Sequence, residues 1–177
     1  MIIAICGTPG TGKSTVGKAL ANRLGYKFIR LSDHLNITEN KELEISISAF
    51  KRIADKYIKD NTILVSHLAH FLTSKKIDLF IVLRCDPLIL RKRLSKRRYN
   101  KEKKYDNIMF EALDGSFIET RELHKNVLQI DNTKNLSKVV NQLESFIIAR
   151  KLPPKFKKDY SNEIPKLERF KLAKSAY

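Results

Sequence analysis

The sequence lacks several features that would each point to a particular class of protein. Its only two cysteines, Cys6 and Cys85, are too few for a disulfide scaffold, so we expect two small core residues in a reducing compartment. No apolar run is as long as a membrane span, no internal repeat is found, and the first residues lack the layout of a signal peptide. These absences favour a cytoplasmic protein without a membrane partner, whose 177 residues suffice for one domain with a full core.

Acidic residues are also scarce, with 19 Asp and Glu against 35 Lys and Arg, which gives a formal net charge of +16. A surplus of this size is typical of proteins that contact polyanions, with RNA or ribosomal particles as the first expectation. The alternative is a basic surface that is simply solvated. Charge alone does not decide between the two interpretations.

The first 25 residues contain the pattern around which the rest of the chain is organised. The apolar run Ile2–Cys6 predicts a buried strand. Residues 7–14, GTPGTGKS, fit the phosphate-binding pattern G-x-x-x-x-G-K-[ST] at every fixed position. Residues 15–24 then predict an amphipathic helix that Gly25 ends. This order indicates a P-loop, although a glycine-rich turn that binds nothing has the same local features.

The residue types of this loop suit the triphosphate of ATP. Glycines such as Gly10 and Gly12 let successive backbone N–H groups turn towards a phosphate chain, and the helix N-terminus adds its positive dipole end. Lys13 can reach the β- and γ-phosphates, and the Ser14 hydroxyl is a ligand for Mg²⁺, which takes its other ligands from water and phosphate. Thr15 is also expected to contact the nucleotide. The sequence therefore predicts that the chain binds a nucleoside triphosphate, or something very like one, together with Mg²⁺.

Beyond the P-loop, strands and helices alternate. Strands are predicted over residues 26–31, 63–68, 77–85 and 127–131, and helices over 43–59, 69–74, 86–97, 103–123 and 136–151. This order predicts an α/β fold with a doubly wound, parallel, five-stranded sheet. Ligands of such sheets bind at the carboxyl ends of the strands, and that edge collects the P-loop together with Asp33, His67, Arg84 and Asp131-Asn132.

From Pro153 onward the sequence becomes lysine-rich and only weakly periodic. A segment with so few apolar anchors is expected to be flexible or to bind a polyanionic partner, so that truncation after Leu152 leaves ATP turnover nearly intact. The alternative is that this tail packs against the body as a helix through its apolar side chains, which are Tyr160, Ile164, Leu167 and Phe170.

Residues 83–111 carry a spaced pattern of mostly charged residues: Arg84 and Asp86, Arg93-Leu94, Arg97 and Tyr99, Lys103, Asn107-Ile108 and Glu111. Together with the P-loop and a strand that ends in His67, this pattern resembles that of the CINAP-like adenylate kinases. These are small atypical nucleotide kinases and ATPases of archaea and eukaryotes, tied to maturation of the small ribosomal subunit. The resemblance covers about residues 1–151.

This resemblance implies a P-loop nucleoside-monophosphate kinase fold over residues 1–152. Within it we expect a segment that binds the nucleoside monophosphate at about 32–60 and a short lid at about 96–106, followed by a basic extension over 153–177. The resemblance also implies ATP as phosphoryl donor, AMP as acceptor, and a small-subunit ribosomal protein and rRNA as partners.

Roles for single residues follow from the same resemblance. Arg97 matches the ATP-contacting lid arginine, His67 matches the histidine at the strand end, and Lys134 lies in a stretch similar to the loop that cradles adenine. Arginine suits a transferring phosphoryl group because its fork donates two hydrogen bonds, and Arg93 is expected on the same helix face as Arg97. Alternatively, Arg97 is a solvated surface residue, or the basic stretch 91–104 faces RNA.

Two positions depart from the family pattern. Val65 stands where an aspartate that holds a magnesium-bound water is usual, so that no carboxylate remains on that strand. Asp33 is then the best remaining carboxylate for the outer magnesium shell, although capping a helix is its simpler role. Arg98 replaces the lid glycine, which would stiffen the lid or add a contact to phosphate or RNA. The predicted catalytic set is Lys13, Arg97, Asp33 and His67.

Three functions remain open. The favoured one is an ATP-dependent nucleoside-monophosphate kinase that converts ATP and AMP into two ADP, with slow ATPase activity. The second is a nucleotide-gated assembly factor whose turnover resets its binding to a ribosomal protein or rRNA. The third is a P-loop kinase of another small acceptor, because residues 36–61 depart most from the family.

Overall fold

Five parallel strands form a sheet in the order β2-β3-β1-β4-β5 in the computed structural model of the protein, which describes residues 1–35, 46–149 and 159–172. Each neighbouring pair is parallel. The predicted α/β fold with a five-stranded parallel sheet is therefore confirmed. The strands are β1 (Ile2–Cys6), β2 (Lys27–Arg30), β3 (Thr62–Val65), β4 (Leu79–Arg84) and β5 (Val127–Asp131).

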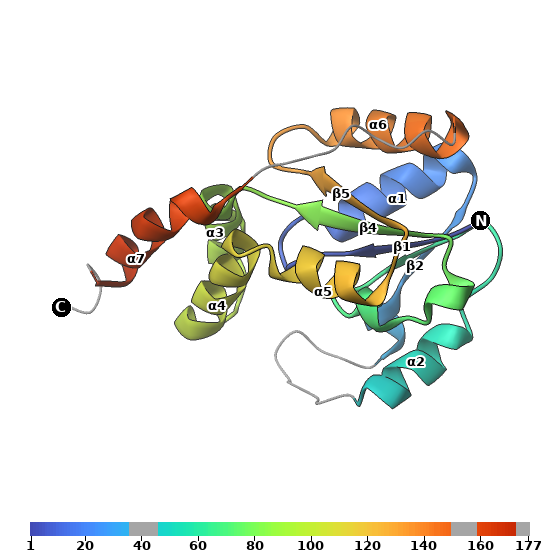
Figure 1. Cartoon of the computed structure of the whole chain (residues 1–177), viewed down its shortest axis with the longest axis horizontal. Helices are drawn as coiled ribbons and strands as arrows, with labels where there is room; N and C mark the ends of the chain where they lie inside the picture. The colour runs from blue at the N-terminus through green and yellow to red at the C-terminus, as the bar shows by residue number, and fades with distance from the viewer. Residues whose placement is uncertain (36–45, 150–158, 173–177) are drawn as a thin grey trace.

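Helices cover both faces of the sheet and group at its carboxyl edge (Figure 1). The described helices are α1 (Lys13–Leu24), α2 (Ile47–Asp55), α3 (Pro87–Ser95), α4 (Lys101–Ala112), α5 (Gly115–Leu123), α6 (Leu136–Ala149) and α7 (Ile164–Leu172). Short 3₁₀ turns lie at η1 (Leu31–His34), η2 (Ala69–Phe71), η3 (Ser74–Lys76) and η4 (Ser161–Glu163).

Each face of the sheet has its own apolar core. Because successive side chains of a strand point to opposite faces, Ile3 and Ile5 of β1 pack towards α1 and α6, whereas Ala4 packs towards the face that α2 and α5 cover. Strands β3 and β4 are buried along their whole length. This is what a continuous apolar run predicts for a central strand of a parallel sheet.

A third apolar cluster lies beyond the carboxyl ends of the strands, where α3, α4 and α7 meet (Figure 1). Leu90 and Leu94 of α3 pack there with Ile108 of α4 and Leu167 of α7, and all four are buried. Tyr160 and Leu167 are buried, so the described part of the tail has the packed arrangement that was the alternative prediction, while the side chain of Phe170 lies outside the description. Residues 150–158 and 173–177 lie outside the described part of the chain.

The single helix predicted over 103–123 is wrong, because the chain turns between α4 and α5. Asp114 has a left-handed backbone there, with φ of 60°, and its carboxylate pairs with Arg84. The ring of Phe110 fills the space that a side chain at Gly115 would need, so a larger residue there would have to displace that ring. Helical periodicity continues through the corner in the sequence and therefore does not reveal it.

Other predicted boundaries shift by a few residues. Strand β3 ends at Val65, so His67 lies beyond the strand. Asp33 does not cap a helix, since it lies inside η1, whose N-cap residue is Arg30. The short helix expected over 69–74 is the pair of 3₁₀ turns η2 and η3. Part of the helix predicted over 43–59 falls outside the described residues; in the rest, α2 ends at Asp55, so the predicted helix is four residues too long at its C-terminal end.

The two cysteines are buried and free, as predicted. Burial raises the pKa of Cys6 to about 11 and that of Cys85 to about 12, so both thiols stay protonated near neutral pH. Within the described residues, each helix is too short or too polar to span a bilayer.

Candidate active site

The P-loop connects β1 to α1 and bends sharply at three glycines. Gly7, Gly10 and Gly12 have φ values of 131°, 94° and 97°, a region that residues with a side chain rarely adopt. Lys13 begins α1, and its Nζ donates hydrogen bonds to the carbonyl oxygens of Gly7 at 2.6 Å and Thr8 at 2.9 Å. The lysine therefore lies along its own loop, at the place where a bound phosphate chain would meet it.

The charge of Lys13 is poorly compensated in the free protein. Its pKa is lowered from 10.5 to about 8, mainly by burial; Cys6 and Glu111 oppose this effect, and the guanidinium of Arg97 adds the smallest contribution, a lowering one. Within the described residues this partly buried ammonium donates hydrogen bonds only to carbonyl oxygens, so it favours an added anion, which would stabilise the charged form. The loop therefore has the electrostatics of an anion site.

Neighbouring segments hold the shape of this loop. A Cβ atom on Gly10 would lie 2.8 Å from Leu90 and 2.9 Å from Leu94 of α3, so the loop packs directly on that helix. A Cβ atom on Gly12 would collide with the side chain of Asn132. The Nδ2 of Asn132 donates to the carbonyl oxygen of Thr11 at 2.8 Å. Two walls, α3 and the β5–α6 loop, thus enclose the P-loop.

Arg93 has a different role from the one that the sequence predicted. Its Nη2 donates to the carbonyl oxygens of Asn132 and Thr133, each at 2.9 Å, and its Nη1 donates to that of Thr11 at 3.4 Å. The guanidinium is therefore used to join the P-loop to the β5–α6 loop. Moreover, α3 ends at Ser95, so the prediction that Arg93 and Arg97 share one helix face is wrong.

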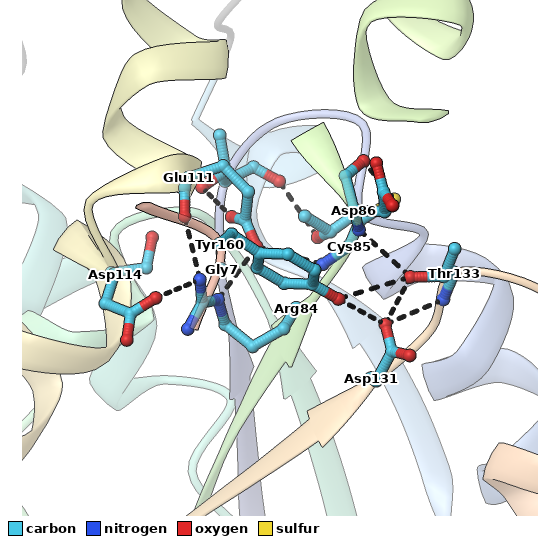
Figure 2. A network of polar contacts seen from close by, with 12 residues as sticks. Gly7, Arg84, Cys85, Asp86, Glu111, Asp114, Asp131, Thr133 and Tyr160 are labelled. Atoms are coloured by element: carbon cyan, nitrogen blue, oxygen red, sulfur yellow. Dashed lines mark hydrogen bonds and ion pairs between the residues drawn. The ribbon is translucent and has the colours of Figure 1, made fainter. Parts of the chain in front are cut away.

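A buried carboxylate connects the P-loop to α4 (Figure 2). Glu111 accepts hydrogen bonds from the Thr8 hydroxyl, from the Nε of Arg84 at 2.8 Å and from the backbone N–H of Cys85 at 2.9 Å. The side chains of Glu111 and Arg84 are 0% and 1% exposed. Arg84 also donates to the backbone oxygen of Glu111 at 2.7 Å and to the carboxylate of Asp114. A single network thus joins the first turn of the P-loop, the end of β4 and the α4–α5 corner.

One guanidinium, that of Arg84, faces two carboxylates in this network. Burial by itself lowers the pKa of Arg84, but the Glu111 and Asp114 carboxylates outweigh it and the pKa is raised overall. The guanidinium therefore stays charged. A buried pair of this kind destabilises a protein strongly, by about 3–5 kcal/mol, when one partner is removed, because the other charge is left uncompensated.

The contact between Glu111 and Thr8 was not predicted from the sequence. The family pattern contains Glu111, but nothing local relates it to Thr8, which lies 103 residues away in the chain. The one usable signal was that an acidic residue falls among the apolar positions of a predicted helix and is therefore expected to have a buried partner.

Arg97 lies in the five-residue linker between α3 and α4. Its Nη1 donates to the Tyr99 hydroxyl at 3.2 Å, its guanidinium lies 5.8 Å from the centroid of that ring, and Lys103 approaches the ring at 5.4 Å. Its effect on the pKa of Lys13 places its charge near the P-loop. The structure therefore brings Arg97 and Lys13 into electrostatic reach of each other.

His67 is also near the P-loop, just past the end of β3. Burial and the positive charge of Lys13 lower its pKa to about 4, with smaller contributions from His70 and Lys103. Neighbouring protein atoms therefore crowd the imidazole, while the residue keeps part of its surface accessible to solvent. At neutral pH His67 is a neutral group beside a lysine and does not add a cation.

Two further predicted site residues, Asp33 and Lys134, lie at the surface. Asp33 is half-exposed at the edge strand β2, where its carboxylate pairs with the Nε of Arg30 at 2.7 Å. Lys134 is exposed and follows the loop residues Asn132 and Thr133 that contact the P-loop side. The predicted segment at 32–60 is only partly described, because residues 36–45 lie outside the described ranges.

Sequence comparisons place the chain among known proteins. A family model described as an AAA domain matches residues 3–114. A Thermococcus kodakarensis protein named "Putative adenylate kinase" is 37% identical over 154 residues, which cover 83% of this chain and 85% of the relative. A protein of the same name from Archaeoglobus fulgidus is 39% identical over 152 residues, covering 83% and 82%. The chain belongs to this adenylate-kinase-like P-loop family.

Solved structures of lower similarity share the fold of this adenylate-kinase-like chain. Shikimate kinase from Acinetobacter baumannii, solved in complex with shikimate, aligns with a TM-score of 0.66 at 16% identity, over 85% of this chain and 94% of that one. At this identity the likeness shows the fold alone.

The adenylate-kinase-like site offers few protein ligands for a metal ion. Ser14 and Thr15 lie in the first turn of α1, and Ser14 is partly accessible. Val65 is buried against α1, because a Cβ atom on Gly17 would lie 2.7 Å from its Cγ2. Within the described residues, no group of three His, Cys, Asp or Glu side chains is arranged to hold a metal. A magnesium ion here would depend on Ser14, water and the phosphates of a substrate, which suits its preference for retained waters.

The lowered pKa of Lys13 predicts that ATP binding takes up a proton in alkaline solution. Below about pH 8 the free lysine is already charged; above it the free lysine is neutral, and bound phosphate restores the proton. ATP affinity should therefore be level below that pH and fall by up to about tenfold per pH unit above it. Calorimetric titrations in two buffers of different ionisation enthalpy, at about pH 7 and about pH 9, measure the proton directly.

The control is Lys18→Ala, which removes an exposed lysine from the same helix and should leave proton uptake unchanged. Equal uptake at both pH values in the wild-type chain would contradict the assignment of Lys13 as the titrating group.

Proposed function

We propose that this protein is an ATP-dependent nucleoside-monophosphate kinase that transfers the γ-phosphoryl group of ATP to AMP and releases two ADP. The observation that carries this proposal is Lys13, a partly buried cation with a pKa lowered to about 8 that lies inside a P-loop. The names of the relatives support a nucleotide as the acceptor. The closed arrangement of α3, α4 and the β5–α6 loop around the P-loop supports binding of the donor at that point.

The residues present fit ATP with magnesium. Gly7, Gly10 and Gly12 bend the loop so that it can wrap a phosphate chain, and the N-terminus of α1 adds the positive end of its dipole. Bound magnesium would neutralise charge that develops on the phosphates during transfer. Ser14 is the residue that would hold it.

In the proposed reaction the bond between the γ-phosphorus and the β–γ bridging oxygen breaks, and a phosphate oxygen of AMP forms the new bond. Little covalent work is asked of the protein, which mainly positions the groups and stabilises charge. Lys13 holds the donor phosphates, while Arg97 moves with the 96–100 linker onto the transferring group. His67, neutral at working pH, can exchange hydrogen bonds with phosphate or water without adding charge.

A role for Asp33 in the outer magnesium shell is also proposed, and it requires a change in the contacts of Asp33. Its carboxylate is paired with Arg30 at the sheet edge and would have to leave that partner. Glu111 does not replace it, because its two carboxylate oxygens already accept three hydrogen bonds. Magnesium would therefore be held mainly through Ser14 and water.

The proposal is tested by measuring transfer from ATP to a panel of acceptors that includes AMP, GMP, CMP, UMP and shikimate, with magnesium present. AMP should be the best acceptor, and ADP should appear from donor and acceptor in equal amounts. Lys13→Ala should lower the rate by about a hundredfold or more, because it removes a cation from the transferring phosphates.

The matched control for this assay is again Lys18→Ala, which should keep the wild-type rate. ATP hydrolysis that no acceptor accelerates would favour a nucleotide-gated assembly factor instead. Preference for a non-nucleotide acceptor would mean that the chain is a kinase of another small molecule.

A polyanionic partner is a second proposal, supported by the net charge of +16. We propose that the chain binds RNA, as a factor in maturation of the small ribosomal subunit would. Exposed cations gather around the linker between α3 and α4, where Lys96, Arg98 and Lys101 have only Glu102 as a close acidic neighbour in sequence. Such a cluster can contact successive phosphates without specifying a sequence.

This second proposal predicts that RNA affinity falls steeply with salt. Replacing Lys96, Arg98 and Lys101 together by Gln should lower the slope of log affinity against log salt by about 2, roughly 0.7 per phosphate contact on a single strand. The matched control replaces Lys51, Lys56 and Lys59, exposed lysines on and after α2. An equal loss of slope in both triple variants would show that the linker cluster has no special contact with RNA.

A further inference from the structure

Tyr160 lies where the C-terminal segment crosses the carboxyl ends of β4 and β5 (Figure 2). Its side chain is buried, and its hydroxyl donates to the Oδ1 of Asp131 at 3.0 Å and lies 3.4 Å from the Oγ1 of Thr133. Its ring centroid is 5.5 Å from the Cζ of Arg84, the arginine of the Glu111 network. Burial, followed by the charge of Asp131, raises the pKa of Tyr160, so the hydroxyl keeps its proton and remains a donor.

Asp131 and Thr133, which the Tyr160 hydroxyl contacts, fix the β5–α6 loop. Asp131 accepts hydrogen bonds from both the backbone N–H of Thr133, at 3.1 Å, and the Thr133 hydroxyl. The same hydroxyl accepts from the backbone N–H of Asp86 at 2.9 Å, which ties the loop to the start of α3. Tyr160 thus completes a set of contacts that holds the loop in one conformation.

This loop is in direct contact with the P-loop. Asn132, between the two partners of Tyr160, donates to the carbonyl oxygen of Thr11 at 2.8 Å and lies against Gly12. Any movement of the loop would therefore change the space beside Gly12 and Lys13. Each residue between the Tyr160 hydroxyl and the P-loop backbone therefore contacts the next one.

A second, apolar path leads from the same segment to the P-loop. Leu167 of α7 packs in the cluster that contains Leu90 and Leu94 of α3. Those two leucines are the side chains that a Cβ atom on Gly10 would meet. The C-terminal segment therefore supports both walls of the P-loop, one by hydrogen bonds and one by packing.

We propose that Tyr160 is a positioning residue for the nucleotide site, and that it acts by holding the β5–α6 loop against the P-loop. The C-terminal segment that carries Tyr160 and α7 then contributes to the nucleotide site. This inference rests on the proposed function, since it assumes that the P-loop binds ATP. It replaces the sequence-based expectation that truncation after Leu152 leaves ATP turnover nearly intact.

The test compares Tyr160→Phe with the wild-type full chain. The substitution keeps the ring and removes the hydroxyl donor. Amide hydrogen exchange without nucleotide should become faster over residues 10–13 and 131–133. The KM for ATP should rise about tenfold, the effect of roughly one lost hydrogen bond, while kcat changes by less than about twofold. Tyr26→Phe is the matched control, because Tyr26 is partly buried and packs against the apolar cluster that contains Val16 and Leu20 of α1.

Additivity supplies a second readout. Asp131→Asn removes the charge that the Tyr160 hydroxyl contacts, so the double variant Asp131→Asn, Tyr160→Phe should raise KM by less than the product of the two single effects. A merely structural role would lower the melting temperature and leave the KM of the folded protein unchanged.

The outcomes separate this inference from the proposed function. Unchanged exchange over residues 10–13 in Tyr160→Phe would overturn the positioning role whatever the activity. Faster exchange with the wild-type KM for ATP would overturn it as well. If the wild-type chain does not bind ATP, the proposed function falls, and the exchange rates alone then decide whether Tyr160 positions the P-loop.

Discussion

The buried pair of Arg84 and Glu111 is the constraint on which the site depends. Burying two charges is costly, and hydrogen-bond partners around the pair offset much of that cost. Here the partners come from separate segments: Thr8 from the P-loop, the N–H of Cys85 from the end of β4, and Asp114 from the α4–α5 corner. Because all of these segments contact the pair, the P-loop and the helix that follows the 96–100 linker are held in one fixed relation.

The P-loop therefore takes its shape from its neighbours as much as from its glycines. Glycine permits the positive φ angles, but the atoms that fill the adjacent space are Leu90, Leu94 and Asn132. Arg93 joins two of these walls through backbone carbonyls. Because the site is already formed before a phosphate chain binds, binding costs little conformational entropy. The bound phosphate also supplies a counter-charge to Lys13, which is poorly compensated in the free protein.

Local patterns in the sequence were sufficient for the strands, the P-loop and the carboxyl edge. β1 and β5 fall at the predicted residues because apolar runs with turn residues around them are local signals. The α4–α5 corner was missed because helical periodicity runs through Asp114. The roles of Arg93 and Tyr160 were missed because their partners lie 39 and 29 residues away and are selected by packing. Asp33 follows the carboxyl end of β2, as predicted. Its pairing with Arg30 depends on the turn η1, where the sequence suggested only that Asp33 caps a helix.

The most direct test of this account removes the single hydroxyl that joins the P-loop to α4. In Thr8→Val the shape of the side chain is kept while Glu111 loses its P-loop donor. Amide hydrogen exchange across α4 is measured with and without ATP in the wild type and in this variant. The account predicts that ATP slows exchange in both the P-loop and α4 of the wild type, and in the P-loop alone of Thr8→Val. Equal slowing of α4 in both proteins would contradict it.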